Sequence, residues 1–237
     1  DGKINTADVV AVYDYIISGE ASGIPRDHAN VNGDANVNSA DVVAIYNYLI
    51  SGQEPVLTYK AGDVEFNMVF VEGGTFQMGA TPEQEDPNDN EKPVHSVTLS
   101  SFAIGQTEVT QALWTTVMGN NPSKFQGSDL PVEMVSWNDC QLFVKKLNEQ
   151  LADQLPEGKV FRLPTEAEWE FAARGGNKSQ GYQFSGGNTL DDVAWNKDNS
   201  DGTTHIVGQK QANELGIYDM NRYRCRGSIT NYLFIHD

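Results

Sequence analysis

The sequence predicts an α+β protein in two parts: a small all-α segment of paired loop–helix repeats, then a larger mixed α+β domain with much irregular loop. Three observations predict this. Residues 1–19 recur as residues 34–52 with twelve of the nineteen positions identical. From residue 64 onward, short apolar stretches with strand-like alternation are mixed with a few helical patterns. Residues 176–213 are rich in Gly, Asn, Ser and Asp, a composition typical of irregular chain.

The composition excludes several classes of function. The chain has 237 residues and a formal net charge of −17, with 39% hydrophobic and 21% charged residues. These values are typical of a folded protein, and the negative charge argues against nucleic-acid or anionic-membrane partners. There is no apolar run long enough to span a bilayer and no visible signal peptide. Because residue 1 is Asp1, we expect the chain to begin downstream of the start that its gene encodes.

Each copy of the repeat ends in a predicted amphipathic helix. The apolar residues at helical spacing in the second copy are Val42, Val43, Ile45, Tyr46, Leu49 and Ile50. Those in the first copy are Val9, Val10, Val12, Tyr13, Ile16 and Ile17. Gly residues follow both helices, where a helix usually ends. Neither helix can bury its apolar side alone, so we expect the two copies to pack together.

Side-chain oxygens precede the second helix at the spacing of an EF-hand-like calcium loop. The residues at loop positions 1, 3, 5, 9 and 12 are Asn30, Asn32, Asp34, Asn38 and Asp41, and Asn36 at position 7 would offer its backbone carbonyl. Two departures weaken the expected affinity. Ala35 replaces the usual Gly at position 6, and position 12 is Asp rather than the longer Glu.

The first copy retains only the second half of such a loop. Its residues at positions 5, 7, 9 and 12 are Asp1, Lys3, Asn5 and Asp8. Calcium binding is the favoured interpretation, because so small a segment without cysteine needs a metal to be stable. The alternative is that these Asn and Asp residues only cap the helices.

Residues 1–52 resemble a type I dockerin module in their spacing, duplication and missing first EF-hand helix. The resemblance implies Ca²⁺ as a ligand and a cohesin domain as the partner. In dockerins, loop positions 10 and 11 contact cohesin, which here implies Thr6, Ala7, Ser39 and Ala40. The near symmetry of the repeats suggests two equivalent binding orientations.

The rest of the chain is predicted as a linker over 53–62, a domain over 63–220 and an aberrant tail over 221–237. Strands are expected at 64–72, 75–79, 94–99 and 102–107, and helices at 110–118 and 137–151. Another helix is expected after Thr165, because Thr165 and Glu168 have capping-box spacing. We expect aromatic residues such as Trp195 and Tyr182, or bound ions, to pin the irregular segment.

The second domain resembles the formylglycine-generating (sulfatase-modifying factor) family. The matching strings are FVEGGTFQMG at 70–79, EKPVH at 91–95, IGQTEVTQALWTTVMG at 104–119, LPVEMVSWND at 130–139, RLPTEAEWEFAARGG at 162–176 and NELGIYDM at 213–220. The resemblance implies a C-type-lectin-like fold. It also implies oxidation of a sulfatase cysteine to formylglycine by copper that a C-terminal cysteine pair holds.

This chain departs from the family at the cysteine pair. Its two cysteines, Cys140 and Cys225, lie far apart in the sequence, and the family pattern stops after Met220. We therefore expect a truncated or frameshifted tail and a noncatalytic domain. The four histidines, His28, His95, His205 and His236, are scattered, so we expect structural roles for them rather than an iron site.

The sequence thus predicts a secreted or cell-surface bacterial protein that docks onto cohesin and carries a noncatalytic lectin-like domain with a protein or glycan ligand. One alternative is a copper-dependent formylglycine-generating oxidoreductase whose active-site region is missing from this chain. Another is an accessory module of a polysaccharide-degrading assembly. No nucleic acid and no membrane insertion are expected.

Overall fold

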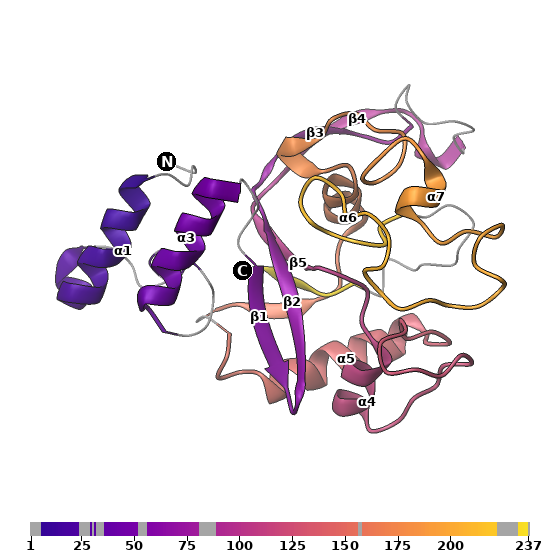
Figure 1. Cartoon of the computed structure of the whole chain (residues 1–237), viewed down its shortest axis with the longest axis horizontal. Coiled ribbons are helices and arrows are strands. Elements are labelled where there is room, and N and C mark those ends of the chain that lie inside the picture. Colours follow the sequence, from indigo (N-terminus) through magenta and orange to yellow (C-terminus); the bar gives the residue numbers. More distant parts are fainter. Residues whose placement is uncertain are drawn as a thin grey trace.

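The computed structural model describes residues 6–23, 29, 31, 36–51, 56–80, 89–155, 158–221 and 232–236. Its elements follow the chain in this order: α1 (Thr6–Ser18), η1 (Gly19–Ser22), α3 (Ser39–Ser51), β1 (Val56–Ala61), β2 (Val64–Val71), β3 (Gly74–Met78), η2 (Asp89–Glu91), β4 (His95–Leu99), β5 (Phe102–Gly105), α4 (Gln111–Met118), α5 (Trp137–Gln150), β6 (Val160–Arg162), α6 (Glu166–Ala173), η3 (Gly176–Lys178), α7 (Leu190–Val193) and β7 (Phe234–His236). Helices and sheets are mixed, so the predicted α+β class is confirmed (Figure 1).

The two repeat helices pack against each other, as the apolar spacing predicts. Val12 and Ile45, which occupy equivalent positions in the two copies, are 1% and 0% exposed and form a small core with Ala29. Val9 and Val42 pack around this core. In Figure 1 the pair is the indigo and purple unit, with α1 and α3 side by side.

The second domain is built on a five-stranded sheet in the order β1-β2-β5-β7-β6, in which every pair is antiparallel. Alternate residues of its strands enter two different cores. Met68 and Ala103 face a core that α4 and α5 complete, whereas Val69 and Ile104 face a core that includes α6. Figure 1 shows α4 and α5 on one side of the domain and α6 with the β3–β4 hairpin on the other.

Local helix signals are confirmed. The Thr165 hydroxyl accepts a hydrogen bond from the Glu168 N–H, and the Glu168 carboxylate accepts one from the Thr165 N–H, which completes the capping box. Thr110 caps α4, and Ser136 forms a second capping box with Asp139 at the start of α5. These contacts satisfy N–H groups that the first turn of a helix leaves without partners.

Two segments differ from the expected organisation. Residues 56–61, within the expected linker, form β1, the outer strand of the sheet. Within the expected aberrant tail, residues 234–236 form β7 between β5 and β6. β1 pairs with the adjacent β2, whereas β7 depends on pairing with β5 and β6, which are far away in the sequence. Strand-forming residues favour such pairing but do not specify the partner.

Candidate functional site

The end of the second predicted calcium loop is well placed to present oxygen atoms. The Asn38 side-chain oxygen accepts a hydrogen bond of 2.8 Å from the Ala40 N–H. The Asp41 carboxylate accepts one of 2.8 Å from the Asn38 N–H. Asp41 is 0% exposed, and a carboxylate is costly to bury without a compensating donor or cation. The arrangement caps α3 and also directs a buried carboxylate toward the loop.

The structure describes only some of the predicted calcium ligands. Asn36 is exposed, Asn38 and Asp8 are half-buried, and Asp41 is buried. The remaining predicted ligands lie outside the described residues: Asp1, Lys3, Asn5, Asn30, Asn32 and Asp34. Within the described parts of the chain, no three His, Cys, Asp or Glu side chains form a group that could hold a metal. The donors that are described, carboxylate and amide oxygens, fit the preference of Ca²⁺ for hard oxygen ligands.

Both repeat helices expose apolar side chains on the side away from their shared core. On α1, Val10, Tyr13 and Ile17 are 59%, 49% and 79% exposed. The equivalent residues described on α3, Val43 and Tyr46, are 54% and 59% exposed. We call these five residues the duplicated apolar stripe. Such large exposed apolar side chains indicate an interaction surface rather than a solvent-facing helix side.

The predicted partner-binding residues lie at the start of the same helices. Ala7, Ser39 and Ala40 are exposed, and Thr6 is the first residue of α1. Thr6 and Val10 are four residues apart, as are Ser39 and Val43, so each pair lies on one side of its helix. The sequence analysis assigned the whole apolar pattern to the core and therefore missed the stripe. The signal available was that each helix has more apolar positions than one buried side requires.

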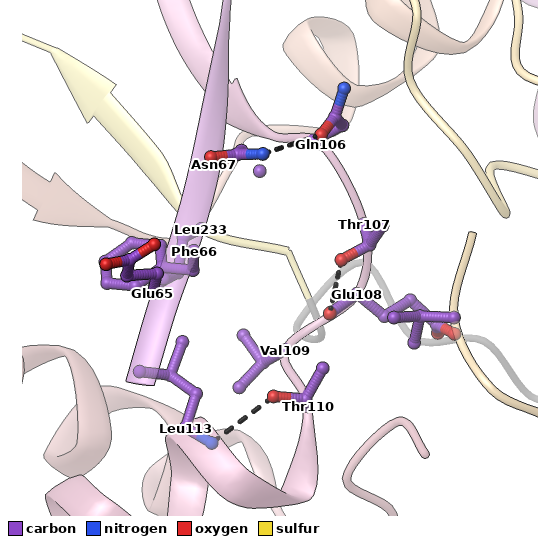
Figure 2. Close-up of a pocket in the computed structure, with 12 residues that line it drawn as sticks. Glu65, Phe66, Asn67, Gln106, Thr107, Glu108, Val109, Thr110, Leu113 and Leu233 are labelled. Carbon is purple, nitrogen blue, oxygen red and sulfur yellow. Dashed lines mark hydrogen bonds between the residues drawn. The ribbon is translucent and has the colours of Figure 1, made fainter. Parts of the chain in front are cut away.

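The second domain has a pocket with a volume of about 210 Å³ between β2, the segment after β5 and the start of α4. Its apolar wall includes Phe66, Val109 and Leu113. Figure 2 shows the Asn67 and Gln106 side chains meeting at one end of this pocket, where the Asn67 amide donates a 3.0 Å hydrogen bond to the Gln106 oxygen. All the residues that line it are described, and none of them is Cys, His, Lys or Arg.

The hydroxyl groups of the pocket are engaged in structural contacts. The Thr107 hydroxyl donates to the Glu108 carbonyl at 3.1 Å, and the Thr110 hydroxyl accepts from the Leu113 N–H at 3.3 Å as the cap of α4. The described lining residues include no thiol and no imidazole, and the carboxylates among them are Glu65 and Glu108.

The structure describes the surroundings of one of the two cysteines. Cys140 is 2% exposed and lies in the core between α4 and α5. Its burial suits a small packing residue and not a surface copper ligand. Cys225 lies outside the described residues.

Side-chain contacts are described for two of the histidines. The His95 Nδ1 lies 3.1 Å from the Pro93 carbonyl oxygen. The His205 ring stacks on Trp195 with 3.8 Å between ring centroids, and its Nε2 lies 3.0 Å from the Ser200 carbonyl oxygen. The Lys210 ammonium lies 4.1 Å from the centre of the Trp195 ring. Trp195 therefore pins the irregular segment, as expected. Tyr182 is 36% exposed, and its hydroxyl donates a 3.0 Å hydrogen bond to the Gln180 side chain; its pinning role stays a prediction.

A buried carboxyl and a buried phenol lie near the pocket, and the sequence analysis did not identify them. Burial raises the pKa of the Asp219 carboxyl, although a hydrogen bond from the Gly208 N–H opposes this. Burial and the negative charges of Glu108 and Asp219 raise the pKa of Tyr232 well above its ordinary value. The Tyr232 hydroxyl donates a 2.6 Å hydrogen bond to the Tyr218 carbonyl, which keeps the phenol neutral and holds the C-terminal segment in place.

Comparisons with known proteins match both parts of the chain. Residues 57–221 match the sulfatase-modifying factor enzyme 1-like domain, and residues 1–50 match the dockerin type I domain. Chaperone protein LppX of Paenibacillus barcinonensis is 37% identical over 202 residues, covering 67% of this chain and 69% of the relative. The inactive C-alpha-formylglycine-generating enzyme 2 of Bos taurus is 27% identical over 218 residues, covering 65% and 67%.

Two solved structures share the fold. Treponema denticola variable protein 1 superposes with a TM-score of 0.60 and 36% identity, covering 69% of this chain and 72% of that one. PvdO from Pseudomonas aeruginosa superposes with a TM-score of 0.54 and 26% identity, covering 69% and 70%.

Proposed function

The chain belongs to the sulfatase-modifying factor enzyme 1-like family through residues 57–221 and carries a dockerin type I domain at residues 1–50, and we propose that it is an extracellular docking protein. In this proposal the dockerin domain binds Ca²⁺ and a cohesin domain, and the second domain is a noncatalytic ligand-binding module. The observation that carries the proposal is the duplicated apolar stripe on α1 and α3, next to the predicted partner-binding residues.

Calcium has a defined role in this proposal. The ligands of the second loop are Asn30, Asn32, Asp34, Asn36, Asn38 and Asp41, and those of the first are Asp1, Lys3, Asn5 and Asp8. Binding would hold each loop against the first turn of its helix, and Asp41 already contacts the Asn38 N–H there. Because few of the described side chains of this unit are buried, metal binding would supply much of its stability.

Calcium is expected to raise the melting temperature of the dockerin domain in the full chain. Ligand at about 100 times its Kd stabilises a folded domain by about 2.7 kcal/mol. The measurement is calorimetry and circular dichroism in EGTA and in millimolar CaCl₂. Asp41→Ala is expected to lose most of the calcium-dependent shift. The control, Asp14→Ala, removes an exposed carboxylate outside the loops and is expected to keep it. Identical melting with and without calcium would exclude the proposal.

Cohesin binding is expected to depend on calcium and on the stripe. With two equivalent orientations, Tyr13→Ser or Tyr46→Ser alone should weaken binding only a few-fold. The reason is that the other helix still presents its part of the duplicated apolar stripe. The double variant should lose binding by about 100-fold or more, the usual scale for removing aromatic anchors. Calorimetric titration with a type I cohesin measures this. Leu142→Ser, an exposed apolar residue on α5, is the control. Complete loss in a single variant would contradict the two-orientation hypothesis.

Several observations support a noncatalytic second domain. Cys140 is buried, and no residue that lines the described pocket is a thiol or an imidazole. One similar protein, from Bos taurus, is named an inactive formylglycine-generating enzyme.

No helix within the described residues is long and apolar enough to cross a membrane. Dockerin modules are typically extracellular, and on that basis we propose that this protein acts outside the cell. An alternative is that it is an accessory module of a polysaccharide-degrading assembly.

The alternative function is copper-dependent formylglycine generation, since other relatives are formylglycine-generating enzymes. A sulfatase-type cysteine peptide, incubated with this chain, Cu(I) and oxygen, is expected to show no aldehyde by mass spectrometry. The Cys140→Ser variant serves as the matched control, because any signal from a site that uses Cys140 must disappear in it. Turnover in the unmodified chain that is lost in this variant would establish the oxidase and reject the noncatalytic proposal.

A further inference from the structure

Helices α1 and α3 have nearly the same sequence, and their charge differs at one position. Neither helix contains Lys, Arg or His, and the carboxylates Asp8 and Asp41 occupy equivalent positions in the two. Only the exchange of Asp14 on α1 for Asn47 on α3 changes the charge. The equivalent positions that differ are Thr6 and Ser39, Val12 and Ile45, Asp14 and Asn47, and Ile16 and Leu49.

Asp14 lies on the same side of α1 as the duplicated apolar stripe. It is exposed, and it follows Val10 by four residues and precedes Ile17 by three. Residues at these spacings are neighbours on the surface of a helix. Val10 and Ile17 are 59% and 79% exposed, whereas Val12 on the opposite side is 1% exposed and packs in the shared core. A partner that covers Val10 and Ile17 therefore also covers Asp14.

Covering Asp14 removes water from a carboxylate, which costs free energy unless a hydrogen-bond donor or a cation replaces the water. Helix α1 has no basic side chain, and no ion pair among the described residues includes Asp14. The replacement is then expected from the partner. The formal net charge of −17 also repels an acidic partner. Charge complementarity therefore favours, for docking through α1, a partner surface that presents Lys or Arg beside its apolar contacts.

We propose that Asp14 makes the two docking sides of the dockerin domain unequal. Docking through α1 selects a cohesin domain that places a Lys or Arg side chain against Asp14, whereas docking through α3 has no such requirement, because residue 47 carries no charge. This inference rests on the proposed cohesin binding and specifies the chemistry of the partner surface. The repeats then offer two orientations with the same aromatic anchors, Tyr13 and Tyr46, and a different dependence on ionic strength.

The test compares two single variants that each weaken one docking side. Tyr46→Ser leaves the α1 side intact, and Tyr13→Ser leaves the α3 side intact. Each is titrated by calorimetry with a type I cohesin that binds the unmodified chain, in millimolar CaCl₂ and at about 50 and 500 mM NaCl. Salt screens the Asp14 contact, so the Kd of Tyr46→Ser is expected to rise about threefold more than that of Tyr13→Ser. Equal salt responses would overturn the proposal.

Moving the carboxylate from one helix to the other identifies the residue responsible. In the Tyr46→Ser background, Asp14→Asn should remove the additional salt dependence. In the Tyr13→Ser background, Asn47→Asp should create the same dependence, because the same basic group of cohesin then faces α3. The control is Asp153→Asn, which removes an exposed carboxylate of the second domain and should leave both responses unchanged. A salt response that does not follow the carboxylate between the helices would contradict the role of Asp14.

This inference can fail while the proposed function stands. If the unmodified chain does not bind cohesin in the presence of calcium, the proposed function fails and this inference fails with it. If binding occurs and both single variants respond equally to salt, only the charge selection is wrong. Each variant must first show the calcium-dependent melting of the unmodified chain. If a serine variant does not, Asp14→Asn alone replaces it, and a salt response equal to that of the unmodified chain would overturn the proposal.

Discussion

Truncation after Asn221 is expected to abolish the cooperative folding of the second domain. The truncated chain lacks β7, which joins β5 to β6 in the middle of the sheet. Ala103 and Ile104 of β5 lose their partners Ile235 and Phe234, and β6 loses the strand with which it pairs. A sheet cannot close around this gap, because the polar backbone groups of both neighbouring strands would be buried without partners.

The stability lost on truncation can be estimated from the buried side chains of the C-terminal segment. Tyr232, Leu233 and Ile235 are 2%, 3% and 6% exposed, and they belong to the cores on both faces of the sheet. Burial of a large apolar side chain stabilises by about 1.5–3 kcal/mol, so losing three approaches the whole stability of a typical domain, about 5–15 kcal/mol. Near-UV circular dichroism and urea unfolding of the truncated chain measure the effect.

Point variants at Ile235 test whether β7 packs into the core of the second domain. Ile235→Val is expected to cost about 0.5–1.5 kcal/mol, whereas Ile235→Asp should prevent folding, because it buries an unpaired carboxylate. If the truncated chain unfolds at the same urea concentration as the full chain, β7 is not part of the fold. That result would favour the interpretation of residues 221–237 as a truncated or frameshifted tail.

Arg162→Met is expected to destabilise the second domain by about 3–5 kcal/mol, the usual cost of leaving a buried charge without its partner. The Arg162 guanidinium holds the Glu168 carboxylate through both of its terminal nitrogens, one of them at 2.9 Å. The Glu168 side chain is only 7% exposed, and it also accepts hydrogen bonds from the Thr165 N–H and hydroxyl at 2.8 and 2.7 Å. Without Arg162, the negative charge stays buried and only the two Thr165 contacts remain.

The control is a surface ion pair of the same type. Lys145 and Glu149 lie 3.9 Å apart with side chains 72% and 64% exposed. Because water screens such a pair, Lys145→Met should change the free energy of unfolding by less than about 1 kcal/mol. Urea unfolding at neutral pH gives both values. Equal effects of the two variants would show that the Arg162–Glu168 pair does not stabilise the fold.

The same pair predicts a pH dependence. Burial by itself disfavours the charged form of Glu168, but the Arg162 and Thr165 hydrogen bonds and the Arg162 charge outweigh it, so the pKa of Glu168 is lowered. A lowered pKa in the folded state means that the stabilisation is present above the unfolded pKa, about 4.3, and is lost as pH falls through the folded value. In Glu168→Gln this part of the acid dependence should be absent. An unchanged acid profile would contradict the assignment.

The predictions that the structure confirms came from short sequence patterns. The repeat located α1 and α3, and the Thr165–Glu168 spacing located the start of α6. The calcium ligands and the cohesin contacts stay predictions, since most of the loop residues lie outside the described parts of the chain. The family strings implied the fold class, which the mixed architecture confirms.

Contacts across the fold decided what the sequence analysis missed. Gln111 reads as an ordinary polar residue of a helix start, yet it is 1% exposed. Its amide donates to the Phe125 and Pro131 carbonyls, and its oxygen accepts from the Gly127 N–H. It thereby organises the loop between α4 and α5. A buried amide is tolerated only where such partners are present, and these come from distant positions in the chain.

By itself, then, the sequence determined the two-part organisation, the repeat helices and their caps, because caps and helical periodicity depend on neighbours three or four residues away. Only the tertiary structure decided that residues 56–61 and 234–236 are strands and that Val10, Tyr13 and Tyr46 face outward. Each of these depends on which segment supplies the hydrogen bonds or removes the water. That choice is made by packing the whole chain, because local composition can favour a strand, as at 56–61, without specifying the segment with which it pairs.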